Sequence, residues 1–128
     1  MLNKTKLSCA ILLLFCSSTI LSQNNDGPFK KLFNREGFVV SFIFYSEGDG
    51  DENNGVVIYL ENKNNYNISF EFTLIFRAGA IDRVKTIDGR MIPLEKRTGS
   101  NDRLYFIPFE DGRSLSEVGI KSCKVRRN

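Results

Sequence analysis

The chain has 128 residues, 41% of them hydrophobic, and a formal net charge of +3, so its length predicts a single folded domain. It contains no histidine, which removes the commonest general base, the commonest metal ligand and every nucleophile system that needs an imidazole. An enzyme of this composition has only carboxylates, lysines and tyrosines to work with, and we expect a protein that acts without catalysis.

Residues 1–22 have the pattern of a secretory signal peptide. Two lysines precede an apolar run over residues 9–16, and small polar residues follow up to an expected cleavage site after Ser22. The run is shorter than the ~18 residues of a membrane-spanning helix, and the bulky Phe15 argues against lipoprotein processing at Cys16. The sequence therefore predicts export to the periplasm or the extracellular space, with no transmembrane segment in the mature chain.

Removal of this leader changes both charge and cysteine content. Two lysines leave with it and every acid stays, so the net charge falls from +3 to +1. A domain so close to neutral gives no electrostatic reason to bind nucleic acid. Cys123 is then the only cysteine, which rules out an intramolecular disulfide and a zinc site. We expect Cys123 to be a small buried residue, with a reactive thiol or an intermolecular bridge as the alternative.

Residues 23–36 form an N-terminal segment ahead of a domain at residues 37–128. Phe29, Leu32 and Phe33 have the spacing of one helical turn, but so short a stretch is marginal as a helix. We expect this segment to lay its apolar side chains on the core of the domain instead.

From residue 37 onward the apolar positions have a period of two, which predicts strands. We expect seven of them, over residues 38–45, 56–61, 68–77, 83–87, 90–94, 104–109 and 116–126. The 38–45 strand is apolar on both faces, which places it centrally in a sheet or beneath another element. In the last strand the parity of the apolar positions switches near Lys121 and Ser122, which predicts a β-bulge.

Polar connections separate these strands. Asp88-Gly89 lies between two of them and favours a type I′ hairpin turn. Residues 46–55 form a long polar loop, and residues 62–67 form a turn rich in asparagine. The pattern predicts an all-β domain, a single antiparallel β-sandwich of about seven strands, with a small barrel as the alternative.

The strand pattern from Phe38 to Arg127 resembles an immunoglobulin-like or fibronectin-III-like sandwich. The chain has no tryptophan and no paired cysteines in its mature part, so it departs from true immunoglobulin domains. The resemblance implies a fold and no particular function, because such sandwiches serve many unrelated functions.

Two groups of residues are candidates for a ligand site. Sugars pack their C–H faces on exposed aromatic rings, and the candidates for such a platform are Tyr59, Tyr66 and Tyr105. Oxygen ligands suit Ca²⁺, and the densest cluster of them is Asp49, Asp51, Glu52 and Asn53. The alternative for this cluster is a solvated hairpin loop, since the EF-hand spacing is absent and its flanks are expected strands.

The function that this sequence supports best is interaction with a protein partner or a surface. Export, an all-β domain and the missing catalytic residues favour it, although no residue identifies the partner. The first alternative is a small carbohydrate-binding or ligand-binding module. The second is a hydrolase with two converging carboxylates, which is disfavoured because most acids are expected in turns, where they bond to the local backbone.

Overall fold

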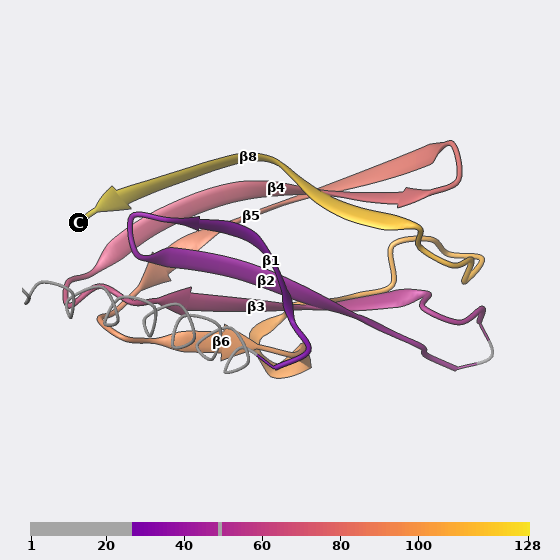
Figure 1. Ribbon diagram of the computed structural model, residues 1–128, viewed down its shortest axis with the longest axis horizontal. Helices are drawn as coiled ribbons and strands as arrows, with labels where there is room; N and C mark the ends of the chain where they lie inside the picture. Colours follow the sequence, from indigo (N-terminus) through magenta and orange to yellow (C-terminus); the bar gives the residue numbers. More distant parts are fainter. Residues whose placement is uncertain (1–26, 49) are drawn as a thin grey trace, which may run out of the picture.

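The computed structural model describes residues 27–48 and 50–128, and this part of the chain is all-β (Figure 1). Two antiparallel sheets form two layers. The first sheet has the order β1-β2-β3-β6, and β7 also pairs with β3; these strands are β1 (Lys30–Arg35), β2 (Phe38–Tyr45), β3 (Gly55–Asn62), β6 (Lys96–Thr98) and β7 (Tyr105–Phe106). The second sheet has the order β5-β4-β8, with β4 (Ile68–Ala78), β5 (Ile81–Met91) and β8 (Glu117–Arg127). A short 3₁₀ helix, η1 (Ser100–Asp102), joins β6 to β7.

The two sheets share one hydrophobic core. The inward residues of β4 are buried while their neighbours alternate outward, and the buried set is Ile68, Phe70, Phe72, Leu74, Phe76 and Ala78. Phe38 of β2 stacks on Phe70 with ring centroids 5.0 Å apart and lies 6.2 Å from Phe72. Aromatic burial across the gap therefore holds the sheets face to face, because each such ring removes a large apolar area from water.

Several sequence predictions are confirmed. β2 is buried on both faces over most of its length and lies between β1 and β3, as its doubly apolar sequence indicates. In the β4–β8 ladder, Thr73 pairs with Ser122 and Leu74 with Ile120. Lys121 is therefore the extra residue of a β-bulge at the predicted place.

The predicted hairpin turn at Asp88-Gly89 is wrong, because β5 runs unbroken from Ile81 to Met91. Gly89 pairs with Phe70, and a Cβ at this glycine would lie 3.1 Å from the Phe70 ring. The glycine thus makes room for an aromatic side chain in the neighbouring strand. The true turn is Gly79-Ala80, where Gly79 has a φ of 64°, as expected at the first central position of a type II′ turn.

Other boundaries also differ from the expected ones. Residues 30–35 form a strand that pairs with β2, so the helical turn considered for Phe29 to Phe33 is wrong. Leu32 and Phe33 do pack against the core, as expected. The 90–94 strand is absent as a separate element, a short strand that was not expected forms at 96–98, and the 104–109 strand is reduced to residues 105–106. The proposed leader, with Cys16, lies outside the described residues.

The buried amide of Asn62 connects three turns at one end of the molecule. Its Nδ2 donates to the carbonyls of Tyr66 (3.0 Å) and Ile92 (2.9 Å), and its Oδ1 accepts from the backbone N–H and the side-chain Nδ2 of Asn64. Asn64 Nδ2 in turn donates to the carbonyl of Glu36 at 2.8 Å. The network therefore links the β1–β2, β3–β4 and β5–β6 connections.

Replacing Asn62 with alanine should strongly destabilise the fold. The change leaves two carbonyls and an N–H without their partner in a site where the side chain is 0% exposed, and we expect a loss of about 3 kcal/mol. Urea unfolding of the protein measures this loss. Asn67→Ala is the matched control, since Asn67 lies exposed in the same turn and should cost less than about 0.5 kcal/mol. Equal losses in the two variants would contradict the role of the network.

Candidate functional site

The three candidate tyrosines do not form one platform. Tyr59 and Tyr105 lie on the outer face of the first sheet, because Tyr105 pairs with Val57, two residues from Tyr59 on β3. The Tyr59 ring lies 5.4 Å from the Phe29 ring. Tyr66 lies apart in the β3–β4 turn, with the Arg127 guanidinium 4.2 Å from its ring centroid. The structure thus brings two of the three tyrosines to one face.

Tyr105 has the most defined surroundings of the three. Its hydroxyl donates to Glu47 Oε1 at 3.0 Å, and its ring makes an edge contact with Tyr45 at 5.5 Å. Desolvation, followed by the hydrogen bond and the charge of Glu47, raises the pKa of Tyr105 to about 12. The exposed Tyr45 extends this aromatic face beyond the residues that the sequence singled out.

The expected calcium ligands lie in a loop that is organised by its own hydrogen bonds. Asn54, which the sequence analysis passed over, is buried and exchanges two hydrogen bonds with the backbone of Glu47. The Asn53 N–H donates to Ser46 Oγ, and its carbonyl accepts from the N–H of Leu115. Asp51 and Glu52 are exposed, and Asp49 lies outside the described residues. Within the described chain no three acids or cysteines gather to hold a metal ion, and calcium binding stays a prediction.

Cys123 lies half-buried on the inner side of β8, opposite Phe72. Burial raises the pKa of this thiol to about 11, with opposite and smaller effects from Arg35 and Glu36. The thiol is therefore protonated at neutral pH and is a weak nucleophile.

A long strand edge that the sequence analysis missed lies along β5. In the second sheet β5 pairs only with β4, whereas β8 lies beside β1 of the other sheet. The two-residue turn makes Ala78 and Ile81 the first hydrogen-bonded pair of the β4–β5 ladder. By alternation, the backbone N–H and C=O groups that face away from β4 belong to residues 82, 84, 86, 88 and 90.

Much of this edge is open. Among the hydrogen bonds of the described residues, the Arg97 guanidinium donates to the carbonyl of Arg90 and so occupies one end. At the other end the Arg83 guanidinium donates to the carbonyl of Asp82 at 3.3 Å. Residues 84–88 remain available along the edge, and Val84 at one end of this span is 61% exposed. Unpaired strand edges of this kind pair readily with another extended chain.

A cleft of about 550 Å³ opens beside the β5 edge, between the two sheets. Its floor includes the buried Leu60 and Leu104, and its walls include Lys85 from β5 and Arg103 from the segment after η1. No hydrogen bond or ion pair of the Lys85 or Arg103 side chain is found within the described part of the chain. The cleft therefore combines an apolar floor with two unpaired cations, as ligand and peptide sites do.

Arg97 closes one end of this cleft. Its Nε donates to Glu95 Oε2 at 2.8 Å, and Glu95 Oε1 accepts the N–H of Ile92 at 2.9 Å. The hydrogen bond from Arg97 is the main reason that the pKa of Glu95 is lowered. Arg97 Nη1 also lies 3.6 Å from the position of a Cβ on Gly89, so this arginine bridges the two sheets over a strand glycine.

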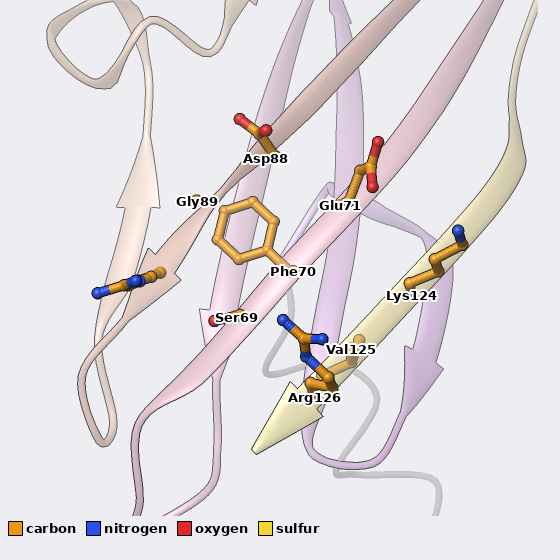
Figure 2. A pocket seen from close by; sticks show the side chains of 9 residues that line it. Ser69, Phe70, Glu71, Asp88, Gly89, Lys124, Val125 and Arg126 are labelled. Carbon is orange, nitrogen blue, oxygen red and sulfur yellow. The ribbon is translucent and has the colours of Figure 1, made fainter. Parts of the chain in front are cut away.

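A second depression, of about 610 Å³, lies on the outer face of the second sheet (Figure 2). Asp88 of β5 pairs with Glu71 of β4, which pairs on its other side with Lys124 of β8. Asp88 was expected in a turn, and its true neighbour is another carboxylate. Arg126 lies on the same strand as Lys124, so the depression has mixed charge.

Comparison of the chain with protein-family models, with curated proteins and with solved structures finds no match. Within residues 27–48 and 50–128, no helix is long and apolar enough to cross a bilayer.

Replacing Glu47 with glutamine should lower the pKa of Tyr105 from about 12 towards its ordinary value of 10.0, because the substitution removes the negative charge beside the phenol. Phenolate absorbance against pH measures the shift, with Tyr105→Phe identifying the late-ionising component. The folded state holds the Tyr105 proton more tightly than the unfolded state does. The protonated phenol therefore stabilises the fold fully below pH 10, and this stabilisation is lost as the pH rises through about 12. A late component that persists in Tyr105→Phe would contradict the assignment.

Proposed function

We propose that the protein is exported, that its domain is an immunoglobulin-like β-sandwich, and that it acts without catalysis by binding a protein partner. The observation that carries this proposal is the open edge of β5 over residues 84–88, which lies beside the inter-sheet cleft. A partner that adds a strand there satisfies free backbone groups with its own and sets alternate side chains in the cleft and on the outer face.

The exposed apolar side chains on β5 support the binding of a partner at this edge. Val84 and Ile81 are 61% and 41% exposed on a strand of eleven residues, an arrangement that proteins usually avoid by shortening or covering the edge. The cleft adds buried apolar floor, which gives the side chains of an added strand a place to be removed from water.

A photo-crosslinking amino acid at position 84 should yield a discrete adduct in the extracytoplasmic fraction of the host. The same probe at Ile92 is the matched control, because Ile92 is 62% exposed but lies outside the strand. Thr86→Pro should abolish the adduct, since proline removes an N–H that faces the partner and none that faces β4. An adduct of equal yield from position 92, or one that survives Thr86→Pro, would contradict partner binding at this edge.

A second candidate function is carbohydrate binding on the outer face of the first sheet. It is favoured by the shared face of Tyr59 and Tyr105 and by the Tyr45 ring beside them. Aromatic rings on one sheet face are a common platform for the C–H faces of sugars.

This alternative predicts a signal on a glycan array that is lost in Tyr105→Ala. Tyr66→Ala should keep the signal, because Tyr66 lies in a separate turn beneath Arg127. Silence of the mature protein across the array would remove the carbohydrate function and leave the β5 edge as the functional site.

A further inference from the structure

The charges beside the β5 edge indicate what kind of segment it accepts. On the outer face, one row of side chains runs across the sheet as Asp88, Glu71 and Lys124 (Figure 2). Like charges directly opposite each other in neighbouring strands destabilise a sheet. Lys124 lies opposite Glu71 on one side. On the other side Asp88 faces the open edge, and its carboxylate makes no hydrogen bond or ion pair within the described residues. A cation from an added strand next to Asp88 completes this row.

The cleft beside the same edge is lined by more cations than acids, since Lys85, Arg97 and Arg103 line it together with Asp88 and Asp102. Within the described part of the chain, the Lys85 and Arg103 side chains make no hydrogen bond or ion pair. Arg83, one position further along the inner face, lies with its guanidinium 4.9 Å from the Phe109 ring centroid. An acid that enters the cleft opposite Lys85 is therefore attracted by this lysine and by Arg103, both of which are exposed cations.

Pairing of β5 with a second copy of itself gives poor charge complementarity. The antiparallel register centred on Lys85 would set Lys85 against Lys85 and Asp82 against Asp88, and both contacts join like charges. The register centred on Thr86 avoids these contacts but sets Lys85 against Ile87 and Asp88 against Val84, so it compensates neither charge. A strand with an acid opposite Lys85 and a base opposite Asp88 complements the edge better than either register.

We propose that β5 binds an extended segment of a protein partner, in antiparallel pairing, with a basic residue opposite Asp88 and an acidic residue opposite Lys85. The antiparallel direction is the more stable one per residue. Inward positions other than the acid are small or apolar, because the one opposite Ile87 faces the apolar floor of the cleft. This inference rests on the proposed function and specifies the chemistry of the partner.

The capped heptapeptide KVTEVTT tests this pattern, since its antiparallel pairing sets lysine opposite Asp88 and glutamate opposite Lys85. The matched control EVTKVTT has the same composition and net charge, with the two charged residues exchanged. Titration of the labelled mature protein by NMR should shift the amide signals of residues 82–88 with the first peptide. The control should bind about tenfold more weakly, since two favourable contacts become two repulsive ones.

Two variants keep the inference falsifiable. Val84→Pro removes an edge N–H and should abolish binding of KVTEVTT, while Val84→Thr keeps that N–H and should retain binding. In Lys85→Glu combined with Asp88→Lys the preference should reverse in favour of EVTKVTT. Equal binding of both peptides, or binding of neither, overturns the charge pattern. The crosslinking from position 84 tests partner binding separately, so the failure of one is distinguishable from the failure of the other.

Discussion

The arrangement of the two sheets depends on the hydrogen bonds of one buried amide, that of Asn62. Both connections that pass from one sheet to the other at this end, β3 to β4 and β5 to β6, contribute a carbonyl to its Nδ2. The backbone of Asn62 also donates to the carbonyl of Glu95 at 2.9 Å. A buried amide has no water to replace these partners, so the two crossings are held at a fixed separation. The position of β6 relative to β5, and hence the closed end of the cleft, follows from that separation.

The cleft beside β5 is open at the end where the inner face of this strand changes from apolar to charged side chains. Along the inner face of β5, Met91 and Ile87 give way to Lys85 and Arg83 as the strand leaves the Asn62 end. Charged groups keep their heads in water, so the sheets are not sealed there by apolar packing. At the closed end Arg97 reaches past Gly89 to the carbonyl of Arg90 on β5. Within its eleven residues, β5 is therefore covered at the Met91 end and open to solvent towards the Ile81 end.

Sequence reasoning predicted the fold class well because most strands have one buried and one wet face. The alternation in residues 68–77 and the parity switch at Lys121 are local signals, and both correspond to observed features. The prediction of a turn at Asp88-Gly89 was wrong because the turn propensity of this pair is also a local signal. The glycine is needed there for another reason, since the ring of Phe70 in the neighbouring strand lies against it. Splitting β5 at that point concealed the edge and the cleft. Two features of the sequence could have indicated the continuous strand. Val84, Thr86 and Asp88 alternate with residues on the inner face, and Gly79 marks the turn that precedes the strand.

Two charged residues would give the proposed β5 site its selectivity. An edge that is protected only by bulky residues or by proline would reject every strand, including a partner. Lys85 on the inner side and Asp88 on the outer side would instead repel a strand with like charges opposite them and attract a strand of the reverse pattern. Arg77 already holds Asp82 through two hydrogen bonds, at 2.8 and 3.2 Å, so Asp88 is the acid of this edge whose charge remains to be compensated from outside. Charge at this edge is therefore compatible both with protection from unselective strand pairing and with the proposed recognition of a partner.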